Sequence, residues 1–388
     1  MPWTFIIRPR EMRKFRRCRR EWDLGSQIRQ RYAQKRPSME WAFDKAVRDA
    51  LAVYYFPAMD DWNRAIVRPL TLKGFDRSMR ESRANHEKWA PLTPEEEKAF
   101  ERNLVVGQAL LNNYFVWAAA LDDFDSIFAD HDIWAPIPDP ANPIHDLGTL
   151  DGRPMRYMGR MDQLIADPDD ELWVVEHRVV RGDWTSNEDL IEDEVLRSHC
   201  WHTQIAYPQM LIAGTIINEL RVDGQLDAPP VQEFVERDQR TMIGSRHVNT
   251  RRSPLTMEPA ATPATRSAAT VQDYVALQQD NGLFRRTVIR RNQDSLKQTG
   301  VRVAEDAMQV RDPNLPVEPT FGDHCATCEF KAPCDAMEAG GDWQAVLAEN
   351  FFQRADDAED ESLRHSDHRV GQRAGLGGMY RVINLGRR

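Results

Sequence analysis

Three cysteines near the C-terminus constrain this chain more than any other feature of its sequence. Cys325, Cys328 and Cys334 form a C-x2-C-x5-C pattern, in which the two-residue gap lets one turn of backbone hold two thiolates on one metal centre. A fourth ligand has to come from elsewhere. Cys18 is the better candidate because arginines flank it and favour a thiolate, whereas Cys200 is the spare. Four thiolates suit zinc and an iron–sulfur cluster equally well by ligand count. The plainer alternative is three reduced loop cysteines with no metal.

Length and composition indicate an ordinary globular protein. The chain has 388 residues, of which 41% are hydrophobic and 29% charged. This suits one large α/β domain with insertions, or two domains, and excludes wholesale disorder and coiled coil. No apolar run approaches the about 20 residues of a membrane span, and Trp3 to Ile7 is too short for a secretory signal. Five cysteines cannot form a disulfide scaffold. We therefore expect a cytoplasmic protein with no membrane partner.

The charge of the chain is divided unevenly between its N-terminus and the rest. Residues 1–36 contain twelve Lys or Arg and three acids, a charge of +9, which leaves −19 for the remainder of a chain whose net charge is −10. A basic end on an acidic body indicates a local site for a polyanion, which the net charge would hide. The arginines expected to contact it are Arg16, Arg17, Arg19 and Arg20.

Apolar periodicity predicts a helical first third, a strand pair and further helices. Helices are expected over 10–33, 38–55, 61–94, 95–120, 189–219 and 271–311. Strands are expected over 155–166, 172–180 and 231–236. Residues 136–148 and 250–270 are expected to be irregular because they are rich in Pro, or in Pro, Ala, Thr and Ser. The last residues of the chain are expected to pack weakly.

The predicted strand pair places two acids opposite each other. Asp162 and Glu176 lie seven residues on either side of Asp169 in the turn, so a regular hairpin would bring their Cβ atoms to about 5 Å. Carboxylates this close repel unless a cation lies between them, and oxygen ligands favour Mg²⁺ or Mn²⁺. Arg178 shares the face of Glu176 and can stabilise a phosphate. The alternative is a surface hairpin whose acids and arginine form solvated pairs.

Together, the cysteine pattern and the acid pair resemble the RecB-like branch of the PD-(D/E)XK nucleases. The resemblance is nearest to the iron–sulfur exonucleases, such as the CRISPR-associated enzymes and the AddB nuclease domain, and covers about residues 10–340. It implies an α/β fold with a restriction-endonuclease-like core, a mixed sheet flanked by helices, and helical insertions. It also implies a [4Fe-4S] cluster that joins the two ends of the domain. The ligands would be Cys18, Cys325, Cys328 and Cys334.

The resemblance also implies roles for residues of the core. Asp162 and Glu176 would bind Mg²⁺ or Mn²⁺, and the main-chain carbonyl of His177 would be a further ligand. Gln204 and Tyr207 look like the helix motif that helps to position DNA, although the family usually has three residues between them and this chain has two. A core tyrosine and a surface glutamine are the alternative.

Two arginines depart from the family pattern. The family lysine of the E-x-K motif falls on Arg178, and the family metal-binding histidine falls on Arg48, with Asp44 in place of a glycine. Arginine is bulkier than lysine, is permanently charged and cannot bind a metal. Arg48 can pair with Asp162 or Glu176, or with Asp44 one helical turn away. His199 or His202 can replace the missing ligand.

A second basic segment is expected on the helix over 271–311. Four arginines flank one of its faces beside Phe284, and guanidinium groups bind phosphates without reading sequence. Exposed aromatics such as Trp3 or Phe284 can stack on unpaired bases, whereas a solvated helix face with a buried Phe284 is the alternative. The arginines are Arg285, Arg286, Arg290 and Arg291.

The expected organisation is one nuclease-like domain over 1–345 and a tail over 346–388. The domain comprises a helical portion (37–150), a catalytic-type core (151–240) and a C-terminal helix with the cysteine cluster (271–340). The expected function is metal-dependent cleavage of single-stranded DNA or DNA ends. A catalytically inactive DNA-binding subunit of a repair or defence complex, with a helicase or another subunit as partner, is the alternative. A zinc-stapled interaction protein is a third.

Overall fold

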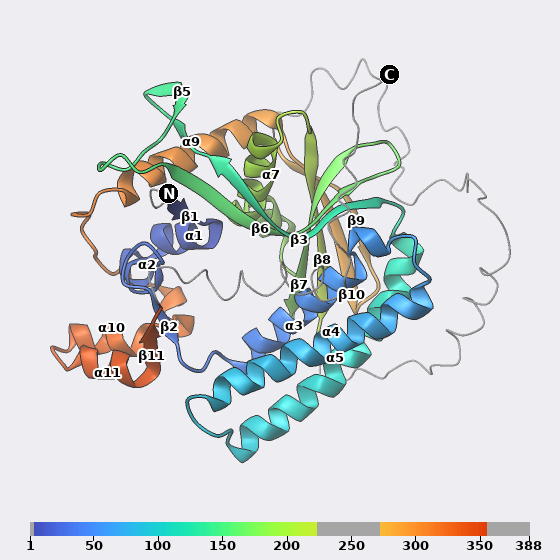
Figure 1. The fold of residues 1–388 in the computed structure, drawn as a ribbon, viewed down its shortest axis with the longest axis horizontal. Helices are drawn as coiled ribbons and strands as arrows, with labels where there is room; N and C mark the ends of the chain where they lie inside the picture. The colour runs from blue at the N-terminus through green and yellow to red at the C-terminus, as the bar shows by residue number, and fades with distance from the viewer. Residues whose placement is uncertain (1–3, 223–271, 355–388) are drawn as a thin grey trace.

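The structure is a computed structural model that describes residues 4–222 and 272–354 (Figure 1). The strand expected over 231–236, the loop expected over 250–270 and Trp3 lie outside the described residues, as does most of the expected tail.

A mixed sheet of seven strands forms the centre of an α/β fold, with helices on both faces (Figure 1). Its order is β1-β6-β7-β8-β10-β9, and β3 pairs with the other edge of β6. β6 is antiparallel to β3 and β7 and parallel to β1, and β7 is parallel to β8. The strands are β1 (Phe5–Ile7), β3 (Asp125–Pro136), β6 (Met155–Ala166), β7 (Leu172–Val180), β8 (Ile212–Arg221), β9 (Tyr274–Asp280) and β10 (Phe284–Arg290).

The β6–β7 hairpin confirms the predicted strand pair with its predicted bounds. Asp167 fixes the turn because its Oδ1 accepts hydrogen bonds from the main-chain N–H groups of Asp169 at 3.0 Å and Glu171 at 2.9 Å. Asp170 adopts a left-handed φ of 59°, a conformation that Asp tolerates better than most residues. The local turn chemistry that marks this hairpin in the sequence is thus realised in the structure.

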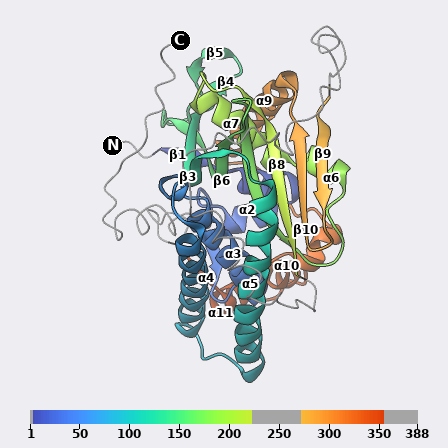
Figure 2. The same ribbon diagram turned by 90° about the vertical axis from the view of Figure 1, so that its right-hand side faces the viewer.

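Helices cover both faces of the sheet. One side carries α1 (Pro9–Arg17), α7 (Glu194–Ala206) and α9 (Gln293–Val310), which share an apolar core with β1 and β6. The other side carries α3 (Met39–Tyr54), α4 (Arg64–Glu87) and α5 (Pro94–Leu121), whose core includes Leu220 and Phe284. α4 and α5 form a long antiparallel pair that extends past the sheet (Figure 2). The helices predicted over 38–55, 61–94 and 95–120 are confirmed as α3, α4 and α5.

Among the described residues, one helix is long and apolar enough to cross a membrane by length and composition, and it is α5. Its residues Leu110, Leu111, Tyr114 and Phe115 are fully buried against α3 and α4. A core helix of a folded domain passes the same test, so α5 is weak evidence for a span.

Two predicted helices are wrong because they contain strands. Residues 212–221 form β8 instead of continuing the helix over 189–219, and residues 274–290 form the β9–β10 hairpin instead of beginning the helix over 271–311. Strands buried on both faces show apolar runs without alternation, and such runs cannot be distinguished from a buried helix by periodicity. β8 is such a strand, since eight of its ten residues are buried.

Two further predictions need correction near the N-terminus and in the helical portion. The helix expected over 10–33 breaks at Cys18, which is extended between α1 and α2 (Arg19–Gly25). The portion 37–150, expected to be helical, includes the twelve-residue strand β3. Residues 136–148 form the short hairpin of β4 (Pro138–Asp139) and β5 (Asn142–Asp146).

The C-terminal segment of the described chain packs against the N-terminal helices. β11 (Phe351–Gln353) pairs antiparallel with β2 (Tyr32–Gln34), and the rings of Phe330 and Phe351 stack at 4.9 Å beside Leu24. The expected tail from 346 therefore begins inside packed structure. The remaining short elements are η1 (Pro57–Met59), α6 (Asn187–Glu192), η2 (Asp323–Thr327), α10 (Lys331–Glu338) and α11 (Trp343–Asn350).

The close approach of α5 to α4 yields a stability prediction. A Cβ on Gly107 would lie 2.0 Å from the Phe75 ring, so we expect Gly107→Ala to lower the free energy of unfolding by about 1–3 kcal/mol. Urea unfolding followed by circular dichroism measures the change. The control is Val105→Ala on the same helix, because Val105 is 69% exposed and the change should stay within about 0.5 kcal/mol. A Gly107→Ala protein as stable as the wild type would contradict this packing.

Candidate active site

The predicted acid pair lies next to a gap between two ladders on one edge of β6, and we call this gap the fork. One edge of β6 pairs with β1 from Met155 to Tyr157 and with β7 from Gln163 to Ala166. Between these stretches, this edge of β6 pairs with no strand in the part of the chain that the structure describes. Asp162 directly precedes the paired stretch and Glu176 directly follows it on β7, so the two acids lie opposite each other in the fork.

Asp162 takes part in the hairpin through its side chain. Its Oδ2 accepts a hydrogen bond of 2.8 Å from the main-chain N–H of His177. Burial raises the pKa of Asp162 above its ordinary value of 3.8, against the attraction of Arg48, and the nearby charge of Glu176 adds to the rise. The two acids therefore share one electrostatic environment.

Glu176 is buried among cationic groups. Its Oε1 accepts a hydrogen bond of 3.1 Å from Arg178 Nε, and its Oε2 lies 3.5 Å from His199 Nδ1. Burial opposes ionisation, but Arg178 and then His199 hold the pKa of Glu176 well below its usual range. The Oε2 atom is buried and has no hydrogen-bond partner among the described residues. The nearest charged group to this oxygen is therefore the imidazole of His199.

Arg178 bridges the fork and helix α7. Its second contact is a 2.9 Å hydrogen bond from Nη2 to Asp193 Oδ2. The other oxygen of Asp193 caps α7 by accepting from the N–H groups of Val195 at 2.9 Å and Leu196 at 3.1 Å. Asp193 was not among the predicted site residues, although an Asp before a helix is a recognisable capping signal.

Two more arginines lie in the field of the acids. Repulsion from Arg48 lowers the pKa of Arg10, whereas Glu176 and Asp162 raise it. Arg48 is also the strongest attracting charge on Asp162. The alternative pairing of Arg48 with Asp44 loses its main support, because Asp44 binds Arg181 at 2.6 Å. Arg10 entered the sequence analysis only as part of the basic N-terminus. Its place at the fork depends on β1 pairing with β6, which no local pattern indicates.

A glycine lets α7 approach the fork. A Cβ on Gly159 of β6 would meet His202 Nε2 at 2.8 Å and His199 Cδ2 at 3.3 Å. His199 therefore reaches Glu176. His202 faces away from solvent and shares a hydrogen bond of 2.6 Å between its Nδ1 and the carbonyl oxygen of Ser198. Of the two histidines proposed as replacement ligands, the structure brings His199 to the acids.

Gln204 and Tyr207 have contacts within the fold. Gln204 Nε2 donates to the carbonyl of Met210 at 2.5 Å, and its Oε1 accepts from the N–H of Ile212 at 3.1 Å. Gln204 thus fixes the link from α7 to β8. Tyr207 is the C-cap residue of α7. Its ring packs on Phe128 with ring centres 5.7 Å apart.

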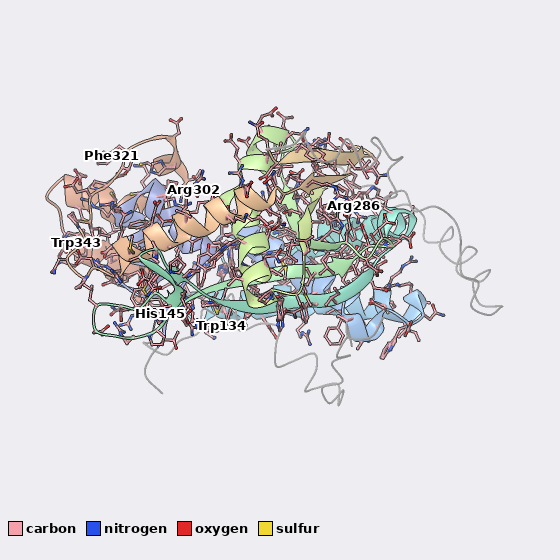
Figure 3. All side chains as sticks on the ribbon, turned by 90° about the horizontal axis from the view of Figure 1, so that it is seen from above. Trp134, His145, Arg286, Arg302, Phe321 and Trp343 are labelled. Carbon is pink, nitrogen blue, oxygen red and sulfur yellow. The ribbon has the colours of Figure 1, made fainter. Side chains whose placement is uncertain are left out.

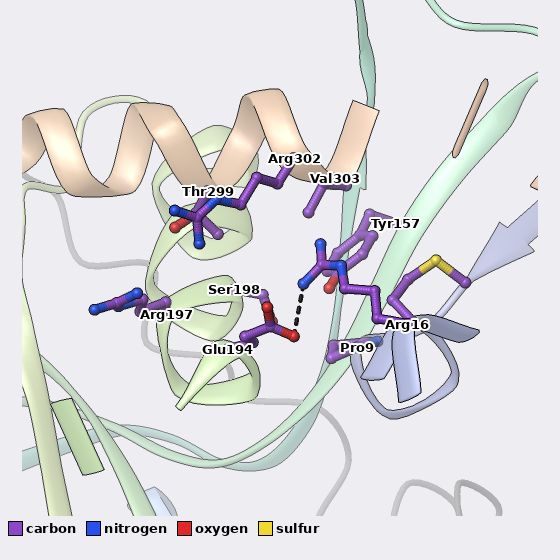
Figure 4. Close-up of a pocket in the computed structure, with 10 residues that line it drawn as sticks. Pro9, Arg16, Tyr157, Glu194, Arg197, Ser198, Thr299, Arg302 and Val303 are labelled. Carbon is purple, nitrogen blue, oxygen red and sulfur yellow. Dashed lines mark ion pairs between the residues drawn. The ribbon is translucent and has the colours of Figure 1, made fainter. Parts of the chain in front are cut away.

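The arginines flanking Cys18 also contact other parts of the chain. Arg16 binds Glu194 at 2.6 Å (Figure 4), which joins α1 to α7, and Asp306 at 2.5 Å, which joins α1 to α9. Arg17 contacts Glu21, Arg19 contacts Gln309, and Arg20 contacts Glu338. These contacts hold the N-terminal helices in place. They also occupy the guanidinium groups that were expected to bind DNA.

The arginines expected on a helix lie on β10 or directly after it, and they form ion pairs, of which the pair of Arg290 is half-exposed and the other three are mostly buried. Arg285 pairs with Glu219, and Arg286 with Asp122 at 2.7 Å. Arg290 pairs with Glu171, and Arg291 with Asp273 at 2.9 Å. Phe284 is buried, as the alternative interpretation held. The prediction of a basic helix face for nucleic acid is therefore wrong, because the spacing belongs to a strand.

The Cys18 segment and the C-terminal cysteine segment lie side by side, with α2 near α10 (Figure 1). Arg20 Nη1 lies 3.5 Å from Cys334 Sγ, and Lys14 pairs with Glu329 between Cys328 and Cys334. Burial raises the pKa of the Cys328 thiol to about 11, and Cys18 is near enough to add to the rise. Across the described residues, no group of three or more His, Cys, Asp or Glu is arranged to hold a metal ion. Cys200 is buried elsewhere, 3.2 Å from Thr215 Oγ1.

Comparison with known proteins leaves the function of this site open. No family model matches the sequence, and no curated protein matches it. A solved structure titled "Crystal structure of SSO0001" is similar over 50% of this chain and 71% of that chain, with 13% sequence identity and a TM-score of 0.20. A likeness at that TM-score carries no argument about this chain.

Buried histidines make the stability of the fold depend on pH. Burial and nearby His199 lower the pKa of His202 from 6.5 to about 3. The stabilisation from a neutral His202 is present above pH 6.5 and is lost as the pH falls toward 3, by up to about 1.4 kcal/mol per pH unit. Urea unfolding at several pH values between 4 and 7 should give a shallower pH dependence for His202→Gln than for the wild type.

The control for this experiment is His145→Gln, because His145 lies in the exposed strand β5 (Figure 3). It should leave the pH dependence unchanged. Equal slopes for the wild type and His202→Gln would show that His202 does not titrate with the fold.

Proposed function

We propose that this protein is a metal-dependent nuclease that cleaves phosphodiester bonds of single-stranded DNA or DNA ends. The observation that carries the proposal is the fork, in which Asp162 and Glu176 lie opposite each other and Glu176 Oε2 is buried 3.5 Å from His199 Nδ1. The mixed sheet flanked by helices is the architecture that the PD-(D/E)XK resemblance implies. A cytoplasmic location accompanies the proposal.

The oxygen donors of the fork suit Mg²⁺ or Mn²⁺. Mg²⁺ commonly binds one or two carboxylates and completes its shell with water and substrate phosphate, so two acids are enough. Asp162 and Glu176 would hold the ion, with the main-chain carbonyl of His177 as a further ligand. When bound, such an ion polarises the phosphate and activates a water molecule. Arg178 lies against Glu176 and would stabilise negative charge that develops on the phosphate.

A nuclease assay with Mn²⁺ and the Asp162→Ala variant tests the proposal. We expect wild-type cleavage of single-stranded or end-containing DNA and a loss of at least about 100-fold in Asp162→Ala, since even outer residues of metal sites cost 10–100-fold. Asp169→Ala is the matched control because Asp169 is an exposed acid in the turn of the same hairpin. Cleavage that survives Asp162→Ala would refute the proposal.

A DNA-binding subunit without catalysis is the second candidate, and the arginines at the fork favour it. Arg178 and Arg48 already compensate the charge of Glu176 and Asp162, so guanidinium groups can fill the role of a metal. This candidate predicts that the wild type and Asp162→Ala bind single-stranded DNA equally and that neither cleaves it. A repair or defence complex, with a helicase or another subunit, would then supply the catalysis.

We also propose that Cys18, Cys325, Cys328 and Cys334 hold a [4Fe-4S] cluster that joins the ends of the described chain. The chemistry of the donor set supports this proposal, because the four thiols are free and Cys18 lies near Cys328. The cationic neighbours Arg20 and Arg17 suit negatively charged thiolates. Zinc is compatible with the same four ligands.

Visible absorption and metal analysis separate these metals. We expect protein purified without oxygen to be brown and to carry about four iron and four sulfide ions per chain. Cys18→Ser should lose both the colour and the iron. Cys200→Ser should keep both, since Cys200 lies in another part of the core. Colourless wild-type protein that contains zinc would refute the cluster.

A further inference from the structure

A row of buried polar side chains crosses the sheet directly behind the fork. His177, Asn218 and Arg286 are register neighbours on the adjacent strands β7, β8 and β10. Each is at most 4% exposed, and the row faces the core formed by α3, α4 and α5. Apolar residues occupy most of this interface, so a polar row has to be satisfied from within the protein.

Three residues from the helical layer close the row into a ring. Asp122 accepts from Arg286 Nη2 at 2.7 Å and from the Tyr55 hydroxyl at 2.8 Å. The Tyr55 and Tyr114 hydroxyls lie 2.7 Å apart. Arg286 Nε donates to Asn218 Oδ1 at 2.7 Å. Arg286, labelled in Figure 3, thus joins Asn218 to Asp122 within the ring.

The imidazole of His177 is held on two sides by this ring. It stacks on the Tyr55 ring with centres 5.5 Å apart and planes inclined by 7°, and its Nδ1 lies 3.4 Å from Asn218 Nδ2. Tyr114 meets its edge at 6.1 Å. The side chain of His177 is therefore fixed by contacts from three different elements, α5, β8 and the end of α3.

The main chain of the same residue holds the first acid of the fork. The 2.8 Å hydrogen bond from the His177 N–H to Asp162 Oδ2 crosses the place where the β6–β7 ladder ends. Any shift of β7 at His177 moves this donor, and the Asp162 carboxylate moves with it. Buried ion pairs such as Arg286–Asp122 contribute little net stability over apolar residues of the same size, so stability alone does not explain the ring.

We propose that the ring of Tyr55, Tyr114, Asp122, Asn218 and Arg286 is a positioning device for Asp162 and acts through His177. The inference rests on the proposed function, because it assigns the ring to the same metal-binding acids. None of the five residues faces the fork. They are positioning residues and contact neither the proposed metal nor the DNA.

The test uses two variants of the ring and one matched control. Tyr55→Phe removes only the hydroxyl, and Arg286→Met removes the buried charge while keeping most of the volume. Arg291→Met is the control, because Arg291 forms an equally buried ion pair with Asp273 at 2.9 Å, five residues further along the chain and outside the ring. All three are compared with Asp162→Ala.

The first readout is the main-chain amide resonance of His177 in protein labelled with ¹⁵N-histidine, which gives ten histidine amides in this chain. Asp162→Ala assigns the resonance and marks its position without the acceptor. We expect Tyr55→Phe and Arg286→Met to move it toward that position and Arg291→Met to leave it in place. A resonance that stays at its wild-type position in both ring variants overturns the inference.

The second readout is Mn²⁺ affinity, measured by calorimetry on folded protein. The ring variants should bind Mn²⁺ about tenfold more weakly than the wild type, as for other outer-shell residues, and Arg291→Met should bind it normally. Equal affinity in all three variants overturns the inference and leaves the nuclease proposal standing. If wild-type protein binds no Mn²⁺, the nuclease proposal fails, and the amide resonance alone decides the positioning role.

Discussion

One edge of strand β6 pairs with β1 near its start and with β7 near its end. The candidate site lies between these two ladders and depends on this arrangement. A strand whose edge is fully paired leaves no room for polar side chains between itself and the next strand. Here the ladder with β7 ends at Gln163, and the ladder with β1 begins at Tyr157. The carboxylates of Asp162 and Glu176 lie beside this stretch, and an oxygen of Asp162 takes the place of a main-chain acceptor. The hydrogen bond from the His177 N–H to Asp162 is the clearest example of this replacement.

The fork brings charges of both signs together, and their balance decides its chemistry. Two buried carboxylates alone would repel and favour a shared proton. Arg178 and His199 prevent this at Glu176, and Arg48 opposes it at Asp162. The acids are therefore suited to a further cation only if it displaces or supplements an arginine. This competition distinguishes the two functions proposed for the fork, and it concerns Arg178 and Arg48.

Local signals made the hairpin predictable, whereas the surroundings of the site depend on distant pairing. Asp162 and Glu176 were placed correctly because an Asp-rich turn fixes the register between them. Arg10, Asp193 and the buried ring could not be placed the same way, since they reach the fork through β1, the start of α7 and the strands β8 and β10. β8 and β10 were predicted as helix, because β8 shows no alternation and β10 carries buried arginines at a spacing that also suits a helix.

The arginines of this chain show how position determines what a charge does. The sequence suggested two basic surfaces for nucleic acid, yet Arg16 is half-buried and paired with Asp306, and Arg286 is fully buried and paired with Asp122. An arginine that is buried and paired has given up its hydration and its field is neutralised, so it adds little attraction for a phosphate backbone. Arg10 differs, because it lies in the field of Glu176 and Asp162 and Arg48 repels it. A bound phosphate would neutralise excess positive charge next to the acids. The proposed chemistry is therefore placed at the fork.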